Sequence, residues 1–255
     1  MAIQRVQSKW AKTKVLLQSE QLREYMPLTK RLEPETLRSM LDKYGMVYVK
    51  PVNGTFGHGV IRVEHHPGGG ARSYTFQEGT SLASCGSYEE LHRRLLAKIK
   101  RRPYLVQQGI ELLRHQNRRF DIRAMVQKNG PHWETTGLIG RLAHPKRIVT
   151  NYHSGGTPMD LSMLMIGHLQ GNELHEFEEK LRRLGVAIAN QLQTAYPGLK
   201  EIGVDIAVDT KMHPWILEVN TLPDPFIFRK LKDKRVFPKI YRYAVAYGRF
   251  RKRSK

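Results

Sequence analysis

Cysteine is almost absent from this sequence, since Cys85 is the single one among 255 residues. One cysteine cannot form an internal disulfide, which excludes a disulfide-stapled secreted domain and favours a reducing compartment. No nucleophile signature surrounds Cys85, so we expect an inert thiol. Long apolar runs are also missing, because no stretch reaches the roughly 18 residues that a membrane helix needs. The N-terminal segment has no apolar signal core, and we therefore expect a cytoplasmic protein.

Acidic residues are scarce relative to basic ones. The chain has 23 Asp and Glu against 43 Lys and Arg, which gives a formal net charge of +20. Much of the excess lies in residues 229–255, where twelve basic residues accompany Asp233 alone. This segment indicates contact with nucleic acid or another polyanion. The alternative is a solvated basic helix face, which the lack of a recognition motif favours for the segment taken alone.

The common nucleotide-binding fingerprints are absent as well. The loop containing Gly54, Gly57 and Gly59 has no Gly-Lys-Ser/Thr sequence, and a predicted strand rather than a helix follows it. A loop between two strands can form a flap whose backbone N–H groups cover phosphates, because glycine permits close approach and positive φ. Lys50, directly before the loop, would add a point charge. A glycine hairpin without a ligand is the alternative.

The apolar periodicity predicts a chain that mixes helices and strands. One helix is expected to end before Pro27, and the others follow capping, stop and 3–4 spacing signals. The remaining predicted helices cover residues 34–44, 87–102, 172–196 and 237–250. The predicted strands cover residues 46–50, 60–64, 104–107, 119–127 and 132–142. Residues 203–225 read as a β-hairpin.

The hairpin carries polar residues that its structure alone does not require. Period two places Glu218 and Asn220 on one face of their strand, and Asp205 can reach that face from the partner strand. Two carboxylates and an amide oxygen are hard donors of the kind that Mg²⁺ prefers. The hairpin therefore predicts a metal site, with a polar surface as the alternative.

A second polar group lies on two earlier strands. Asp121 and Arg123 alternate on one face of the strand 119–127, and the following strand carries Arg141. Charged residues arranged in this way form either the wall of a polar site or a surface ion pair. From the residues alone, both interpretations stay open for Asp121, Arg123 and Arg141.

The loop at residues 150–157 contains an amide side chain, an imidazole side chain and two glycines that make its backbone flexible. Its residues Asn151, Gly155 and Gly156 are candidates for wrapping a substrate or a phosphate. His153 lies between them, but a loop histidine is more often hydrogen bonded than catalytic, so we assign it no acid or base role.

The motifs, taken in order and spacing, resemble the ATP-grasp superfamily over about residues 27–245. The Ser8-Lys9-Trp10 and Tyr25–Thr29 runs are similar to its YheC/YheD group, and other elements resemble RimK-type glutamate ligases. The motifs that carry the resemblance are Lys50-Pro51 with the glycine loop, Val106–Ile110, Asp121-Ile122-Arg123, Arg141, Asn151-x-His153-x-Gly155-Gly156, Asp205 and Glu218-x-Asn220.

The resemblance implies an α+β ATP-grasp fold in which two α+β subdomains clamp a nucleotide between them. It implies a reduced N-terminal helical segment at 1–32, a small subdomain at 33–108, a large subdomain at 109–228 and a basic C-terminal helix and tail at 229–255. It also implies ATP-binding residues, namely Lys50, Gly54, Gly57, Gly59, Gln107, Gln108, Ile110 and Asp121. Asp205, Glu218 and Asn220 would hold Mg²⁺, or alternatively Mn²⁺, while Arg123 and Arg141 would steady the transferring phosphate.

Four departures from the superfamily pattern bear on the site. The N-terminal domain that often binds substrate is reduced here to about 30 residues, which leaves a partner as a candidate to complete the site. No residue clearly matches the second phosphate-binding cation expected before Lys50, and Lys30 and Arg31 are the candidates. In RimK-type ligases an arginine stands at the position of Val149, for which Arg147 is the nearest substitute. Gln108 occupies a hinge position that is often Glu.

The implied reaction joins a carboxylate to an amine through an acyl-phosphate, with ATP as the phosphate donor. A kinase on the same scaffold and a non-catalytic, spore-associated binding protein are the alternatives. The group resemblance adds the forespore or the spore to the cytoplasm as an expected location and links the chain to sporulation. The sequence names neither substrate nor oligomeric state.

Overall fold

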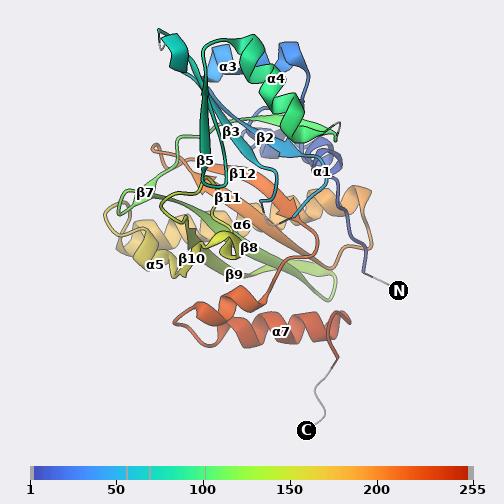
Figure 1. The fold of residues 1–255 in the computed structure, drawn as a ribbon. Helices are drawn as coiled ribbons and strands as arrows, with labels where there is room; N and C mark the ends of the chain where they lie inside the picture. The colour runs from blue at the N-terminus through green and yellow to red at the C-terminus, as the bar shows by residue number, and fades with distance from the viewer. Residues whose placement is uncertain (1–2, 56, 69, 101, 252–255) are drawn as a thin grey trace. The chain divides into compact units, whose positions relative to one another are not determined.

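The computed structural model describes residues 3–55, 57–68, 70–100 and 102–251 (Figure 1). The chain divides into two compact units: unit 1 contains residues 1–26, 112–142 and 157–255, and unit 2 contains residues 27–111 and 143–156. Phe56 of the glycine loop and residues 252–255 of the basic segment lie outside the described residues. The four-segment division expected from the sequence stays a prediction.

Unit 2 is built on a six-stranded antiparallel sheet in the order β1-β6-β2-β3-β4-β5. Its strands are β1 (Thr29–Arg31), β2 (Met46–Pro51), β3 (Ile61–His65), β4 (Tyr74–Glu78), β5 (Ser81–Cys85) and β6 (Tyr104–Gln108). Its helices are α3 (Pro34–Tyr44) and α4 (Tyr88–Ile99), with 3-10 turns η1 (Gly70–Arg72) and η2 (Tyr152–Ser154). The strand, glycine loop and strand expected around residue 55 are thus present as β2 and β3.

Local chemistry explains where the helices of unit 2 begin and end. Pro34 occupies the first turn of α3, and Gly45 closes that helix at φ +68°, a conformation that glycine adopts without strain. The hydroxyl of Ser87 accepts a hydrogen bond from the Glu90 N–H at 3.2 Å and caps α4. The apolar stripes of both helices pack on Val47, Val49 and neighbouring strand residues to form one core. Cys85 is buried in this core, and burial raises the pKa of its thiol, as expected for an inert cysteine.

Unit 1 is built on a second antiparallel sheet in the order β10-β9-β8-β11-β12, with β7 paired to β8. Its strands are β7 (Arg114–His115), β8 (Arg118–Asn129), β9 (His132–Leu142), β10 (Thr157–Met159), β11 (Glu201–Val208) and β12 (Pro214–Asn220). Its helices are α1 (Lys9–Leu16), α2 (Glu20–Arg23), α5 (Leu161–Leu164), α6 (Gly171–Ala195) and α7 (Val236–Ala246), with the 3-10 turn η3 (Phe226–Lys230). The predicted hairpin at 203–225 is present as β11 and β12.

The two faces of this sheet are covered by different elements. Ile122, Ala124 and Val126 alternate toward the face on which the apolar stripe of α6 packs. Met125 and Ile139 lie on the other face and pack against η3 and α7. In Figure 1, α6 runs behind these strands and α7 lies well apart from it. The odd-numbered residues of β8 are thus directed to the α7 face, and this face carries the charged residues described below.

Two helices differ from their expected bounds. The single helix expected before Pro27 is two short helices, because the hydroxyl of Ser19 caps the start of α2. The helix expected to reach residue 250 ends at Ala246, because Gly248 adopts φ +83° and turns the chain. Among the helices that the structure describes, none combines the length and apolar character needed to cross a bilayer.

Candidate functional site

Register brings the predicted charged residues of unit 1 together. Asp121 on β8 lies opposite Arg141 on β9, and Arg123 lies opposite Asp205 on β11. Asp205 in turn lies opposite Glu218 on β12. Directly paired residues of antiparallel strands share a face, and Asp121 and Arg123 are two positions apart on β8, so these five side chains form one charged group on the same face of the sheet.

Four members of this charged group form a buried ion-pair cluster. Arg141 makes two contacts with the Asp121 carboxylate, from Nε at 2.8 Å and from Nη2 at 2.5 Å. Its Nη2 also lies 3.0 Å from Oδ2 of Asp205, whose Oδ1 accepts from Arg123 Nε at 2.5 Å. All four residues are at most 7% exposed. The interpretation as a surface ion pair is therefore wrong, because the paired residues are buried.

Charge pairing within this cluster overcomes the cost of burial. Burial alone would favour the neutral form of Asp205, but the guanidinium groups of Arg123 and Arg141 lower its pKa to about 2. Burial would likewise favour loss of the proton from Arg141, yet Asp121 and Asp205 raise its pKa above the ordinary value. Asp205 and Arg141 therefore carry their charge at neutral pH, and Arg141 is held in a fixed orientation by two carboxylates.

The predicted metal ligands lie beside this cluster. Glu218 and Asn220 are half-buried on β12, where Asn220 lies opposite Gly203. The Glu218 carboxylate also faces the ammonium group of Lys9 on α1, with 3.4 Å between Nζ and Oε1. Within the described residues, no group of three or more His, Cys, Asp or Glu side chains is placed to hold a metal.

The donor chemistry nevertheless suits a hard cation. Glu218 and Asn220 offer oxygens on one strand face, and Mg²⁺ commonly takes only one or two protein carboxylates and completes its coordination with water and phosphate. Asp205 would contribute after exchanging one of its arginine contacts. The residues therefore fit such a group, with Glu218 and Asn220 as the directly available donors.

The predicted ATP-binding lysine of unit 2 belongs to a polar chain across three strands. Lys50 Nζ donates to Oε1 of Gln107, and Nε2 of Gln107 donates to the Thr29 hydroxyl at 3.1 Å. Lys50 is half-buried at the end of β2, whereas Gln107 is 5% exposed. The chain fixes the amide orientation of Gln107 and holds the ammonium group of Lys50 directly before the glycine loop.

The structure brings the two predicted loops of unit 2 together. Gly57 lies at φ +74°, and a Cβ there would stand 3.1 Å from Oδ1 of Asn151. Gly156 has no room for a side chain, since a Cβ would stand 2.0 Å from the Thr150 carbonyl oxygen. The turn is closed by hydrogen bonds from the Ser154 and Gly156 N–H groups to the Asn151 carbonyl, at 2.9 and 3.1 Å. The phosphate-loop candidate and the substrate-loop candidate are thus neighbours.

The rest of the glycine loop and the hinge candidates lie in the same unit. Gly54 and Gly59 both have positive φ, consistent with a loop that needs glycine. The Gln108 N–H donates to the Leu28 carbonyl at 2.8 Å, so this backbone donor is used in joining β6 to the start of β1. Ile110 is 8% exposed just beyond β6. The glycine-loop and hinge candidates therefore lie in one unit, together with Lys50.

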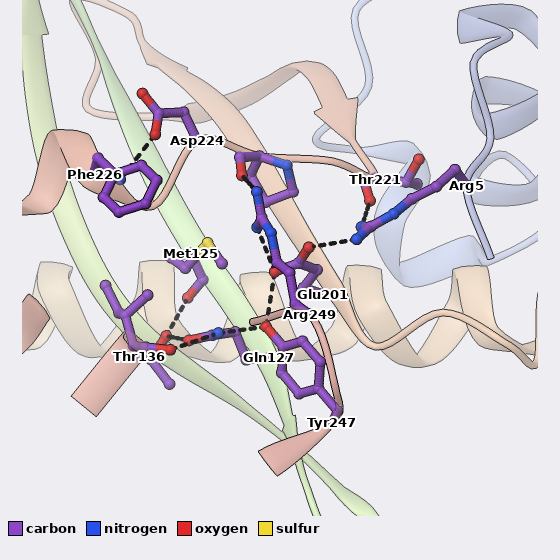
Figure 2. A network of polar contacts seen from close by, with 12 residues as sticks. Arg5, Met125, Gln127, Thr136, Glu201, Thr221, Asp224, Phe226, Tyr247 and Arg249 are labelled. Atoms are coloured by element: carbon purple, nitrogen blue, oxygen red, sulfur yellow. Dashed lines mark hydrogen bonds and ion pairs between the residues drawn. The ribbon is translucent and has the colours of Figure 1, made fainter. Parts of the chain in front are cut away.

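Sequence reasoning assigned no role to three residues of these networks: Lys9, Thr29 and Glu201. Glu201 is fully buried on the α7 face of β11. Its carboxylate contacts Arg5 at 2.8 Å, Arg249 at 2.7 Å and the Tyr247 hydroxyl at 2.7 Å (Figure 2). The signal for Glu201 was its alternation with Gly203 and Asp205, which places it on the same strand face.

Comparisons with known proteins agree with the motif order. A family model described as YheC/D like ATP-grasp matches residues 2–250. Endospore coat-associated protein YheD of Bacillus subtilis (strain 168) is 25% identical over 232 residues, covering 87% of this chain and 49% of that protein. Endospore coat-associated protein YheC of the same organism is 23% identical over 226 residues, covering 84% and 59%. The chain thus spans about half the length of these curated relatives.

A solved structure shows the fold. The ATP-grasp ligase PsnB, complexed with a minimal precursor, aligns with a TM-score of 0.54 at 12% identity, covering 94% of this chain and 60% of that one. At this identity the likeness concerns the fold alone. Together with the helices and antiparallel sheets described above, it confirms the expected α+β ATP-grasp fold.

Proposed function

The chain belongs to the YheC/D-like ATP-grasp family, and on this premise we propose that it is a Mg²⁺-dependent ATP-binding enzyme that joins a carboxylate to an amine. The observation that carries the proposal is the group of buried charges on β8, β9 and β11, where Asp205 lies opposite Glu218 on β12. A structural sheet face has no need of four buried charges, which are costly to desolvate. A site that stabilises transferring phosphate needs charges held in fixed positions.

In unit 1 we assign roles by chemistry. Glu218 and Asn220, with Asp205, would hold the cation, which when bound neutralises charge on phosphate oxygens. Arg123 and Arg141 would stabilise the negative charge of the transferring phosphoryl group and of the acyl-phosphate. Their fixed orientation suits this role, because preorganised donors need not reorient during the reaction.

In unit 2 we assign the nucleotide. Lys50 would contact phosphate oxygens, and the loop Gly54–Gly59 would cover them with backbone N–H groups. The segment from Gln107 to Ile110 would bind the adenine through backbone groups, and Asp121 of unit 1 would serve the ribose or the substrate. The turn at Asn151, Gly155 and Gly156 would contact the acceptor substrate, which is supported by its contact with Gly57.

The test is calorimetric titration of ATP with Mg²⁺ into wild-type protein and the variant Glu218→Ala. We expect the variant to bind about tenfold or more weakly, because it lacks the main available carboxylate donor. Glu176→Ala is the matched control, since Glu176 is exposed on α6 of the same unit. Equal binding by wild type and Glu218→Ala would contradict the metal assignment.

The reaction type is tested separately. Release of phosphate or ADP in the presence of one carboxylate and one amine from a panel supports the ligase. ADP release with a hydroxyl acceptor, and without free phosphate, supports the kinase alternative on the same scaffold. We place the protein in the cytoplasm, the forespore or the spore, and the spore is in line with relatives named as endospore coat-associated.

A second candidate function is a non-catalytic, spore-associated protein that uses its net charge of +20 to hold a polyanion. The basic segment from residue 229 supports it, because twelve Lys and Arg accompany Asp233 alone in residues 229–255. Absence of turnover across the panel, together with binding of a polyanion that weakens steeply with salt, would favour this function.

A further inference from the structure

The first residues of unit 1 form an arm, residues 4–12, that follows the end of β12. The Gln4 N–H donates to the Gly198 carbonyl at 3.0 Å, and the Gly198 N–H donates to Oε1 of Gln4 at 2.9 Å. The Val6 N–H donates to the Thr221 hydroxyl at 2.8 Å, which in turn donates to the Val6 carbonyl at 3.2 Å. Thr221 directly follows Asn220, so the arm is fastened next to the candidate metal ligands.

A second set of contacts makes this attachment rigid. Arg5 donates to the Thr221 carbonyl and also pairs with the buried Glu201 at 2.8 Å (Figure 2). Arg249 pairs with the same carboxylate and donates to the Pro223 carbonyl at 2.7 Å. Glu201 thus orients two arginines whose other contacts are backbone carbonyls of the segment after Asn220. The arm and the ligand-bearing end of β12 are held as one assembly.

The last residues of the arm form the first turn of α1, and this turn directs the ammonium group of Lys9 to the candidate site. The Ser8 hydroxyl caps α1 by accepting from the Ala11 N–H at 3.1 Å. Lys9 and Lys12 are three positions apart, so they share a helix face, and both are at most 9% exposed. Lys12 Nζ donates to the Val6 carbonyl at 2.8 Å. Lys9 extends to Glu218, the most available of the candidate metal ligands, whose charge Lys12 also senses from farther away.

A lysine in this position has two consequences for a site that takes a divalent cation. With no cation bound, the ammonium group compensates the Glu218 carboxylate and lowers its affinity for a competing cation. With a cation on Glu218, like-charge repulsion drives the ammonium group away from the metal, toward anionic ligand groups nearby. The flexible four-carbon side chain of lysine permits this movement.

We propose that Lys9 is a binding residue of this site: it occupies Glu218 while no divalent cation is bound, and it contacts the anionic substrate once the cation has replaced it there. The substrate group is a phosphate or acyl-phosphate oxygen, because these carry the negative charge that accompanies the metal. The inference rests on the proposed function. It also means that the short N-terminal segment itself contributes a site residue.

The experiment compares Lys9→Met with wild type in two titrations. In the first, Mn²⁺ alone is titrated and its binding is followed by electron paramagnetic resonance. We expect Lys9→Met to bind Mn²⁺ about three- to tenfold more tightly, because the competing cation is gone. In the second, calorimetry measures ATP with Mg²⁺, which we expect Lys9→Met to bind about five- to tenfold more weakly, because a phosphate contact is lost.

The controls separate this role from a structural one. Lys14→Met changes an exposed lysine of the same helix, and we expect wild-type values in both titrations. Lys9→Arg keeps the charge and is expected to retain wild-type nucleotide binding within about threefold. Should Lys9→Met fail to fold, Lys9→Gln takes its place in the same two measurements.

The outcomes are distinguishable. Opposite changes in the two titrations support the inference. Weakening of both, or values equal to those of Lys14→Met, overturns it. Failure of the wild type to bind ATP with Mg²⁺ contradicts the proposed function instead, while the titration with Mn²⁺ alone still tests whether Lys9 competes for Glu218.

Discussion

Two buried ionic networks lie on the same face of the unit 1 sheet, and they are built differently. The first joins Arg123, Arg141, Asp121 and Asp205, and its ion pairs connect β8 to β9, β8 to β11, and β9 to β11. The second is centred on Glu201, and its partners come from Arg5 in the arm and from the region around Arg249 after α7. The apolar residues Met125 and Ile139 lie between them along β8 and β9.

The difference indicates a division of labour. Strand pairing alone places the charges of the first network, so they would keep their geometry even if the covering segments moved. The second network instead ties segments distant in sequence to the sheet. We therefore expect changes in the first network to act mainly on chemistry, and changes in the second to act mainly on stability.

The largest effect on stability is expected for Glu201→Ala. The change leaves the guanidinium groups of Arg5 and Arg249 without their shared counter-ion, and breaking a buried ion pair costs about 3–5 kcal/mol of unfolding free energy. Urea unfolding followed by circular dichroism measures this loss, and Glu176→Ala is the control. Nucleotide affinity measured well below the unfolding transition should change by less than about threefold. A loss of stability under about 1 kcal/mol would contradict the anchoring role.

The next effect is expected for Arg141→Lys. Lysine keeps the charge but cannot contact the Asp121 carboxylate through two nitrogens or reach Asp205 at the same time. We expect turnover, measured as phosphate release, to fall about 10²–10³-fold, in the range found for loss of one transition-state donor. Unfolding free energy should fall by less than in Glu201→Ala. The comparison between the networks would be wrong if this variant kept its turnover and lost more stability than Glu201→Ala.

A third test uses pH, because charge pairing lowers the pKa of Asp205 to about 2 despite its burial. A carboxylate with a lowered pKa in the folded state stabilises that state above its unfolded pKa, near 3.9, and loses this contribution as the pH falls toward 2. We expect the wild type to lose about 2 kcal/mol more than Asp205→Asn between pH 4 and pH 2. If the unfolding free energies of the two proteins fell by the same amount over this range, the Asp205 carboxylate would not be stabilised by its charge pairing.

The smallest effect is expected for Thr136→Val at the edge of the second network. The Thr136 hydroxyl donates to Oε1 of Gln127 at 2.6 Å, and Gln127 donates to the Tyr247 hydroxyl at 2.6 Å (Figure 2). Loss of one buried hydrogen bond should cost about 1 kcal/mol, because the amide oxygen loses its donor. Urea unfolding measures the cost, and turnover should not change. A change in turnover with unaltered stability would mean that the two networks are coupled.

Much of the fold followed from local patterns in the sequence. The hairpin at 203–225, the helix at 172–196 and the strands around the glycine loop have the expected type and nearly the expected bounds. These elements have strong periodicity and clear stop signals. The exceptions were the short elements β1, β4, β5, β7, β10 and α5, which were not predicted, and helix ends, where Ser19 begins a new helix and Gly248 ends one early. Single capping residues decide such boundaries, and periodicity does not register them.

The sequence was enough to predict which residues form the site, but not which of them contact one another. Period two placed Asp121 with Arg123 and Glu218 with Asn220, and the register then joined both pairs through Asp205. The sequence alone contains no information on register between strands 80 residues apart, so the sharing of Asp205 by two arginines was not foreseen. Lys9 was noted only as part of a family-like run, because its contact with Glu218 depends on how α1 packs against β12.

The arrangement around Glu201 has a consequence for the order of events during synthesis. Arg5 reaches Thr221 across 216 positions of sequence, and Arg249 returns to Glu201 across 48. Unit 1 is assembled from three stretches of chain, with all of unit 2 threaded between them. Its N-terminal stretch leaves the ribosome long before the other two stretches are synthesised. It can make its contacts only after the last of them has emerged. Residues 27–111 of unit 2 are synthesised before the last stretch of unit 1. Unit 2 can therefore collapse first and shorten the chain distance between the stretches of unit 1 on either side of it.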